Sequence, residues 1–258
     1  MIDIHTHLLP GVDDGSPTAA HSAVVLHRMV SEGVSGVVCT PHLNASQANK
    51  APYDEHRVLL DDLRAMAPPG VELFSGWEIM LDGSGVDLRP MALSLGGSTA
   101  RLVEFPRRPL PPGATEELLR LRMSGIVPVV AHPERYRGCT LDVLHSWREL
   151  GAVLQGDAMA LLGAGPMSEL ARAMLAEGLT DVLASDNHGD RRALSTARRW
   201  LEEIHAGQQA DVMTRENPRC LLENRALAPV PPIRFQTGVF ERLKALLFGR
   251  SRRAAGHA

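Results

Sequence analysis

Short apolar runs alternate with helical patterns along most of the chain, and this alternation constrains the fold more than any other feature. Seven runs end near His7, Thr40, Trp77, Glu104, His132, Gln155 and Ser185. Strands that alternate with helices usually pair in parallel, because each helix carries the chain back to the same edge of the sheet. The sequence therefore predicts an α/β fold of seven strand–helix units, a distorted relative of the eight-stranded TIM barrel.

Side chains able to bind metal follow these apolar runs. His5 and His7 lie two residues apart, so on a strand both imidazoles point to the same face and can reach one ion. In parallel barrels the functional groups gather at the C-terminal ends of the strands. Nine metal-competent side chains are therefore expected on one rim: His5, His7, Asp14, His42, Glu78, Glu104, His132, Asp186 and His188.

This set exceeds the needs of a single ion. Five imidazoles and four carboxylates suit two or three divalent ions of the Mn, Fe or Zn type, with positions left open for water. The remaining histidines on helical segments are predicted to be solvated or to border the core: His21, His27, His56, His145 and His205.

The cysteines exclude several other kinds of site. Cys39, Cys139 and Cys220 contain no CxxC pair, so neither a zinc knuckle nor a disulfide framework is predicted. A cysteine phosphatase needs an arginine six positions after its nucleophile, and none of the three cysteines meets this requirement. A P-loop, a GxGxxG motif and a GxSxG motif are also missing from the sequence.

Composition favours a cytoplasmic globular protein. The 258 residues are 44% hydrophobic with a formal charge of −3, which fits one domain with a sizeable core. The sequence starts without a basic and apolar signal segment, and no window approaches the roughly 20 apolar residues of a spanning helix. The core also lacks an extended basic patch, so no nucleic acid partner is expected.

The last part of the chain differs from the rest, and we predict a boundary after residue 225. A proline-rich stretch at 229–232 precedes a segment with six basic residues and one acidic residue between Arg234 and Ala258. Its apolar residues fit a short amphipathic helix: Phe235, Val239, Phe240, Leu243, Leu246 and Leu247. Docking on its own domain or within a homo-oligomer is the simpler interpretation, and peripheral contact with an anionic membrane face is the alternative.

Several motifs together resemble a known family. MIDIHTHLLPGVDDGS, TPH, GWEI, EFP, AHPERY and ASDNH are similar, in order and spacing, to the PHP-domain (polymerase and histidinol phosphatase) proteins. Within that superfamily the chain resembles the CpsB/CapC/YwqE type, the bacterial manganese-dependent protein-tyrosine phosphatases of capsule and exopolysaccharide systems. The resemblance covers residues 1–225 and implies a PHP fold.

The resemblance also implies roles for individual residues. His5, His7, bridging Glu78 and Asp186 would hold a first ion; Glu78, Glu104 and His132 a second; Asp14, His42 and His188 a third. Arg135 would contact the phosphoryl group, together with Arg191 or Arg192, between which spacing does not decide. The stretch Gly156–Ala160 departs from the family pattern, which usually has a small hydroxyl residue there, and Asn187 stands where a small residue is common.

These observations lead to one functional hypothesis and two rivals. The chain is expected to hydrolyse phosphotyrosine in proteins, with the tail of a bacterial tyrosine autokinase that controls polysaccharide synthesis as its substrate. One rival is a phosphoesterase acting on a small phosphorylated metabolite or a nucleic acid end. The other is a non-catalytic, metal-stabilised regulatory subunit, which would have no need for an open polynuclear site and an arginine beside it.

Overall fold

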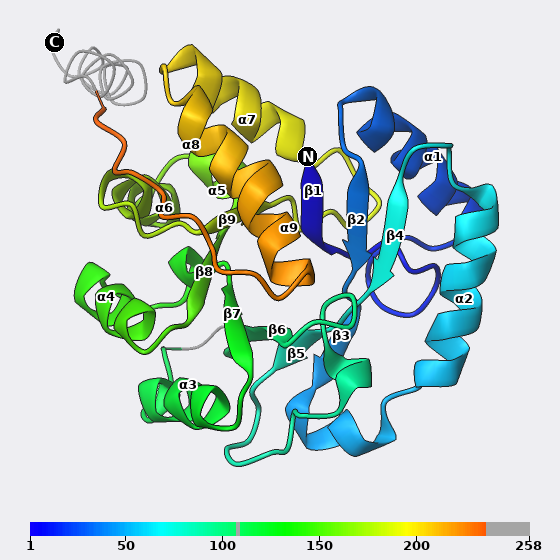
Figure 1. The fold of residues 1–258 in the computed structure, drawn as a ribbon, viewed down its shortest axis with the longest axis horizontal. Helices are drawn as coiled ribbons and strands as arrows, with labels where there is room; N and C mark the ends of the chain where they lie inside the picture. The colour runs from blue at the N-terminus through cyan, green and yellow to red at the C-terminus, as the bar shows by residue number, and fades with distance from the viewer. Residues whose placement is uncertain (107–108, 236–258) are drawn as a thin grey trace, which may run out of the picture.

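The computed structural model describes residues 1–106 and 109–235, and the strands form the centre of the molecule (Figure 1). They are β1 (Ile2–Thr6), β2 (Gly36–Cys39), β3 (His42–Asn44), β4 (Glu72–Ser75), β5 (Glu78–Met80), β6 (Ala100–Glu104), β7 (Val127–Ala131), β8 (Val153–Asp157) and β9 (Val182–Ala184). All pairings are parallel, in the orders β1-β2-β4 and β3-β5-β6-β7-β8-β9.

These nine short strands occupy seven positions around a distorted barrel. The second position is divided into β2 and β3 at Thr40-Pro41, and the third into β4 and β5 at Gly76-Trp77. The two interruptions are level with each other, because Cys39 pairs with Ser75 and His42 pairs with Glu78. Pro41 has no N–H to donate to a ladder, which favours a break there. A parallel bridge between Thr6 and Asn187 connects β1 to the segment after β9. The predicted seven-unit barrel is confirmed.

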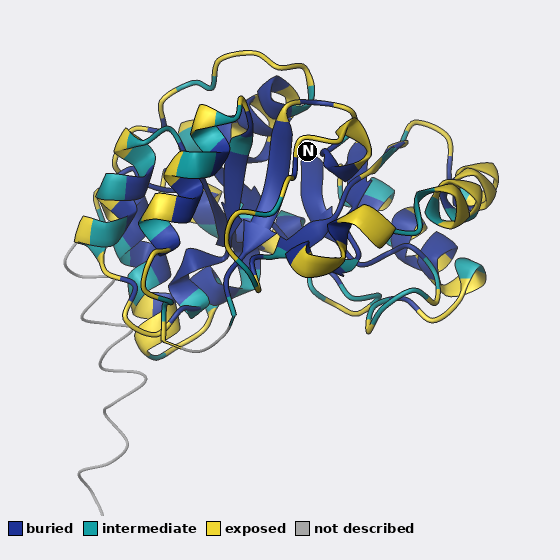
Figure 2. Cartoon of the chain, turned by 90° about the horizontal axis from the view of Figure 1, so that it is seen from below, coloured by how far each residue is buried: buried dark blue, intermediate teal, exposed yellow. Residues whose placement is uncertain are grey.

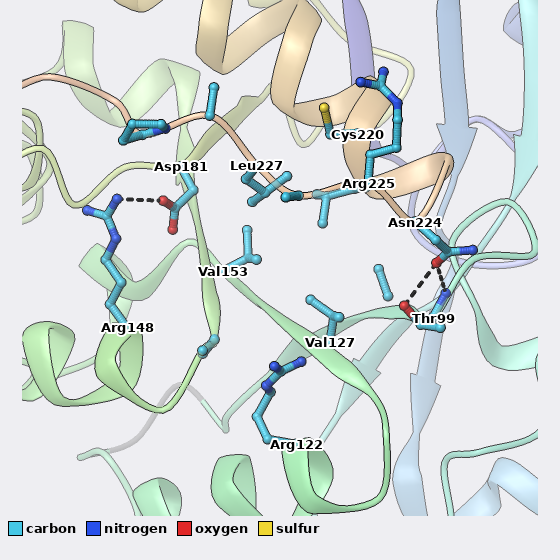
Figure 3. Close-up of a pocket in the computed structure, with 17 residues that line it drawn as sticks. Thr99, Arg122, Val127, Arg148, Val153, Asp181, Cys220, Asn224, Arg225 and Leu227 are labelled. Atoms are coloured by element: carbon cyan, nitrogen blue, oxygen red, sulfur yellow. Dashed lines mark hydrogen bonds and ion pairs between the residues drawn. The ribbon is translucent and has the colours of Figure 1, made fainter.

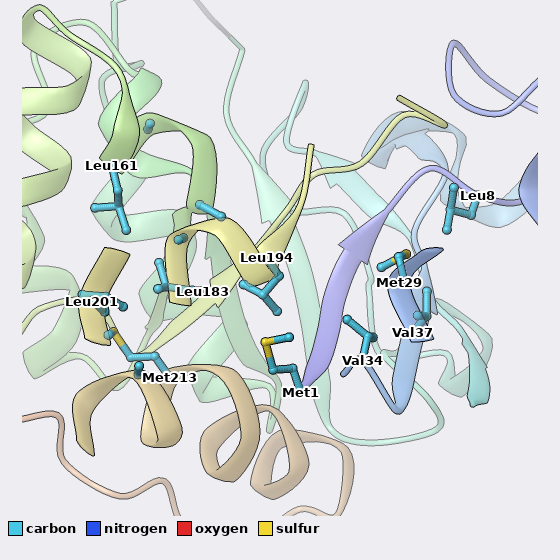
Figure 4. Close-up of a cluster of buried hydrophobic side chains, with 14 of the residues drawn as sticks. Met1, Leu8, Met29, Val34, Val37, Leu161, Leu183, Leu194, Leu201 and Met213 are labelled. Atoms are coloured by element: carbon cyan, nitrogen blue, oxygen red, sulfur yellow. The ribbon is translucent and has the colours of Figure 1, made fainter. Parts of the chain in front are cut away.

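Helices cover the outside of this barrel. They are α1 (Ala19–Ser31), α2 (Tyr53–Met66), α3 (Ala114–Met123), α4 (Leu141–Glu149), α5 (Ala158–Leu162), α6 (Pro166–Ala176), α7 (Leu194–Glu203), α8 (Gly207–Asp211) and α9 (Asn217–Leu222). Shorter turns are η1 (Ala45–Lys50), η2 (Met91–Leu93), η3 (Pro133–Arg135) and the π-helical η4 (Val212–Glu216). Figure 2 shows buried strands surrounded by helices whose outer faces are exposed. Between strands and helices lie clusters of buried side chains, such as the one around Met29, Val37 and Leu183 (Figure 4).

Alternate residues of the strands point into the barrel and thereby place polar groups at its rim. On β6, Ala100 and Leu102 belong to the inner apolar cluster, and Glu104 is the next residue of that row. On β8, Val153 belongs to the same cluster, and Gln155 and Asp157 continue its row. Along each of these rows, the inward-facing side chains therefore change from apolar to polar toward the C-terminal end of the strand.

The opposite end of the barrel is covered by the chain that follows α9 (Figure 3). Asn224 Oδ1 accepts hydrogen bonds from the N–H of Thr99 at 2.7 Å and from its hydroxyl at 2.9 Å. Asp181 is buried, and it forms an ion pair with Arg148 at 3.1 Å and accepts a hydrogen bond from the N–H of Leu154 at 2.9 Å. These contacts fix the N-terminal ends of β6, β8 and β9.

Residues 226–235 continue along the surface of the domain. Val230 and Ile233 are buried in the outer core, and the N–H of Ile233 donates to the carbonyl of Leu175 at 2.9 Å. The boundary after residue 225 stays a prediction. Apart from Phe235, the predicted amphipathic tail lies outside the described residues. The part of the chain that the structure describes contains no candidate membrane-spanning helix.

Candidate metal centre

Four ligand atoms meet at the C-terminal end of the barrel. His5 and His7 approach each other to 3.2 Å between their Nε2 atoms. Each of these nitrogens lies 3.3 Å from Oε2 of Glu78 and 3.3 Å from Oδ1 of Asp186. Ligands bound to one ion at roughly 2.0–2.2 Å are themselves separated by roughly 3.0–3.5 Å. His5, His7 and Asp186 therefore form one group with the spacing of a coordination shell, and Oε2 of Glu78 adjoins both histidines.

Glu78 connects this group to a second one. Its Oε1 lies 2.8 Å from Nε2 of His132, and its Oε2 lies 2.9 Å from Nδ1 of His42. Glu104 lies 3.9 Å from each of the same two histidines. Since Glu78 lies between both groups and presents an oxygen to each, it has the position of a bridging ligand.

A third group lies at the mouth of the site. Asp14 Oδ1 is 3.3 Å from Nε2 of His42 and 3.5 Å from Nε2 of His188. The His188 ring stacks on that of His7, with their centroids 3.9 Å apart. Unlike the inner ligands, Asp14 is exposed. The structure thus brings together all nine side chains predicted as ligands, in overlapping groups at one rim.

Backbone geometry at two strand ends turns ligands toward the centre. His132 and Asp186 both have positive φ, 35° and 49°; His132 directly follows β7, and Asp186 is the second residue after β9. Residues other than glycine rarely adopt this conformation, and it clusters at functional sites. Gly15 allows its backbone to lie close to that of His7, because a Cβ atom at this position would lie 2.1 Å from the carbonyl oxygen of His7.

Two residues that sequence reasoning did not select orient the histidines. Asp13 Oδ2 lies 2.7 Å from Nδ1 of His7, and Gln155 Oε1 lies 2.9 Å from Nδ1 of His5. Such contacts leave Nε2 facing the centre and fix the ring orientation, as outer partners of metal-binding histidines do. The signals available in the sequence were the Asp13-Asp14 pair and the position of Gln155 on an inward-facing row.

The electrostatics of the site favour cations. Burial would raise the pKa of Asp186, but His5, His7 and Arg135 outweigh it and hold that pKa well below its usual range. Burial lowers the pKa of His5, yet Glu78 and Asp186 raise it overall, to about 9. Burial also opposes protonation of His7, but its contacts with Asp13, Asp186 and Glu78 raise the pKa to about 11. Ionised carboxylates in a buried place require positive charge beside them.

The donor set fits divalent ions. Oδ1 of Asp186 is buried and accepts no hydrogen bond, although it faces two imidazole nitrogens. Buried polar atoms without partners are rare and often mark a missing ion or water. Imidazole and carboxylate ligands together suit Mn, Fe or Zn. Burial lowers the pKa of His132, which favours the neutral imidazole that binds metal.

Two arginines lie beside this centre. Arg135 contacts Oδ2 of Asp186 at 2.7 Å and Oδ2 of Asp157 at 2.5 Å. Arg192 contacts the same Asp186 oxygen at 3.2 Å and Asp190 at 2.7 Å. Both arginines line a cavity of about 800 Å³ together with Asp14 and His188. Arg191 is exposed and is not among the residues that line this cavity.

Asp157 pairs with Arg135, and Glu134 in turn contacts Asp157. The sequence did not indicate this role of Asp157. Glu134 Oε1 accepts a hydrogen bond from the N–H of Asp157 at 2.7 Å and so connects the turn after β7 to the end of β8. Asp157 lies in the stretch that departs from the family pattern, and it ends the inward-facing row of β8.

Comparison with known proteins identifies the family of this chain. The model of a family described as "Capsular polysaccharide synthesis, CpsB/CapC" matches residues 1–223. The chain belongs to the CpsB/CapC family. Tyrosine-protein phosphatase YwqE of Bacillus subtilis is 29% identical over 246 residues, which cover 90% of this chain and 95% of YwqE. Tyrosine-protein phosphatase CpsB of Streptococcus pneumoniae is 24% identical over 249 residues, covering 88% of this chain and 100% of CpsB.

A solved structure supports the fold directly. The crystallographic study of YwqE from Bacillus subtilis and CpsB from Streptococcus pneumoniae, described as unique metal-dependent tyrosine phosphatases, includes a chain that matches with a TM-score of 0.73. That chain is 27% identical, and the match covers 91% of this protein and all of the solved chain. The distorted barrel is therefore the CpsB/CapC fold, and the family match ends just after α9.

Proposed function

We propose that this protein is a metal-dependent phosphatase that removes phosphate from tyrosine residues of a protein substrate. The observation that carries this proposal is the convergence of nine ligand side chains and two arginines on one cavity. Membership of the CpsB/CapC family supports it, because relatives in that family are tyrosine-protein phosphatases. A regulatory module without catalysis would not need arginines directed at a cavity beside the ligands.

We assign the ligands to three ions. His5, His7, Glu78 and Asp186 would hold the first; Glu78, Glu104 and His132 the second; Asp14, His42 and His188 the third. Manganese is the proposed metal. When bound, such ions lower the pKa of water and neutralise phosphoryl oxygens, which is the assistance that hydrolysis of a phosphate monoester needs.

The protein's own residues position the substrate. We assign phosphoryl binding to Arg135 and Arg192, whose planar guanidinium groups match phosphate geometry. Asp157 and Asp186 raise the pKa of Arg135, against the effect of burial, so this group stays charged. Arg192 is held by Asp190 and by the carbonyl of Asp186, to which it donates at 2.6 Å. The guanidinium groups of both arginines are therefore in place before the substrate binds.

A cysteine mechanism has no support in the structure. All three cysteines are buried, and burial raises the pKa of Cys39 and of Cys139 to about 12. Cys139 lines the cavity, but at neutral pH it is a thiol and not the thiolate that acts as a nucleophile. The proposed hydrolysis therefore needs no phosphoenzyme.

The proposed substrate is the tyrosine-phosphorylated tail of a bacterial autokinase that regulates capsule or exopolysaccharide synthesis. The open cavity mouth fits such a segment, since Asp14 is exposed and Arg192 is partly exposed there. A flexible, phosphorylated chain can reach the site without rearrangement of the barrel. We place this reaction in the cytoplasm, at or near the inner membrane face.

The experiment is phosphate release by chelator-stripped protein with and without added Mn. A phosphotyrosine peptide is compared with histidinol phosphate, other small monoesters and a 5′-phosphorylated oligonucleotide. We expect Mn-dependent release with the phosphotyrosine peptide as the best substrate. Preference for a small ester or the oligonucleotide would show that the substrate is not a phosphotyrosine protein. Absence of release from every compound would favour a regulatory subunit.

A further inference from the structure

The cavity that contains the two arginines has a second, apolar wall. Asp14, Arg135, His188 and Arg192 belong to its polar lining, together with Glu134, Arg137 and Asp157. The same cavity is also lined by apolar side chains, namely Pro166, Met167 and Leu170 at the start of α6, and Tyr136 and Cys139 from the segment after η3. When the phosphoryl group of a ligand contacts the arginines, the group attached to that phosphate would therefore lie near the apolar lining of the cavity.

The start of α6 is fixed relative to the arginines. Helix α6 packs against η3, which carries Arg135. The buried Arg172 donates to the carbonyl of Leu161 at 2.8 Å and to that of Gly163 at 2.6 Å, and so anchors the turn before the helix. Met167 and Leu170 are three residues apart, so they share one helix face.

Met167 is an apolar side chain without a structural role in the core. It is 40% exposed and belongs to none of the three hydrophobic clusters of the described residues. Leu170, in contrast, packs against the cluster that contains Leu118 and Trp147. Shortening Met167 should therefore leave folding almost unchanged, because single exposed apolar residues contribute little to stability.

We propose that Met167 is a specificity-determining residue that contacts the aromatic ring of the phosphotyrosine, with Leu170 extending the same surface. This inference rests on the proposed function and names the group that selects the aryl phosphate. Burial of ring surface is favourable in proportion to area, and a thioether makes favourable contacts with ring edges. An alkyl phosphate such as phosphoserine presents no ring to this wall.

The test compares two non-hydrolysable probes on the Mn-loaded full chain. Phenylphosphonate and methylphosphonate share the anionic group and differ in the ring, and calorimetry gives their dissociation constants. For Met167→Ala we expect binding of phenylphosphonate to weaken roughly three- to tenfold, with methylphosphonate unchanged. Met167→Leu should restore most of the difference. Met123→Ala is the matched control, since Met123 is 81% exposed on α3 and does not line the cavity.

Turnover separates this inference from the proposed function. Kinetics with a phosphotyrosine peptide and a matched phosphoserine peptide should show that Met167→Ala lowers kcat/KM for the first alone. Equal losses for both peptides, or an unchanged affinity for phenylphosphonate, would overturn the role of Met167 while leaving the phosphatase intact. If the wild type hydrolyses neither peptide, the proposed function fails and this inference with it.

Discussion

The same strands form both ends of the barrel, but the buried carboxylates at the two ends have different partners. At the N-terminal end, Asp181 is paired with Arg148 and hydrogen-bonded to the backbone of Leu154. At the C-terminal end, Asp186 has an oxygen without a hydrogen bond, facing His5 and His7. Both carboxylates are buried. Burial alone therefore does not identify a functional acid, and Asp186 differs from Asp181 by the buried oxygen that faces two imidazole nitrogens without a hydrogen bond.

Asp186→Asn should have the largest effect on activity. The amide keeps the shape but removes the charge that His5, His7, Arg135 and Arg192 surround. We expect kcat/KM with a phosphotyrosine peptide to fall roughly 1,000-fold or more, because ion binding and arginine placement both suffer. Circular dichroism should show a folded protein. Activity near that of the wild type would remove Asp186 from the site.

Arg192→Ala should come next. Its guanidinium lines the cavity beside Asp186, so we expect kcat/KM to fall roughly 100-fold while bound metal is retained. Arg191→Ala is the matched control, since Arg191 is exposed outside the cavity lining, and it should stay within about threefold of the wild type. Equal effects of the two variants would refute the choice of Arg192.

Asp13→Asn should weaken metal binding without removing a ligand. The carboxylate orients His7 through a contact of 2.7 Å, and loss of such an outer partner typically costs roughly 10- to 100-fold in metal affinity. Titration of chelator-stripped protein with Mn measures this change. Because Asn can still contact His7, excess Mn should restore much of the activity. An unchanged Mn affinity would assign Asp13 to loop structure alone.

Asp181→Ala should affect stability and leave catalysis unchanged. Removal of this buried carboxylate leaves the N–H of Leu154 and the guanidinium of Arg148 without their partner, at a cost of about 2 kcal/mol in the free energy of unfolding. Urea denaturation measures it. Asp61→Ala is the control, because its ion pair with Arg64 is largely exposed and contributes little. A large loss of kcat in folded Asp181→Ala would show that the two ends are coupled.

The smallest expected effect is that of thiol alkylation. Because the cysteines are buried and the pKa of Cys139 is raised to about 12, iodoacetamide at neutral pH should leave most of the activity, whereas a chelator should remove it. Phosphate release measured after each treatment checks this. Inactivation by iodoacetamide but not by the chelator would indicate a cysteine nucleophile.

The sequence predicted the barrel and the nine converging side chains because each ligand lies in a short strand, begins one, or lies in the loop that follows one. A parallel fold brings such positions to one rim, so chain order is enough to find them. Asp13, Gln155 and Asp157 were not selected, because their roles depend on which ring or guanidinium lies opposite them in space. The proposed choice of Arg192 over Arg191 likewise rests on the geometry of one loop, in which Asp190 accepts a hydrogen bond from the N–H of Arg192 at 2.9 Å.

We propose that the C-terminal rim holds two or three ions at overlapping ligand groups. The most direct measurement is the metal content of Mn-loaded protein after dialysis, determined by elemental mass spectrometry for the wild type and for His42→Ala. We predict two to three ions per chain in the wild type and about one fewer in the variant, because His42 lies between Glu78 and Asp14. A single ion in the wild type, or an equal content in both proteins, would contradict the account.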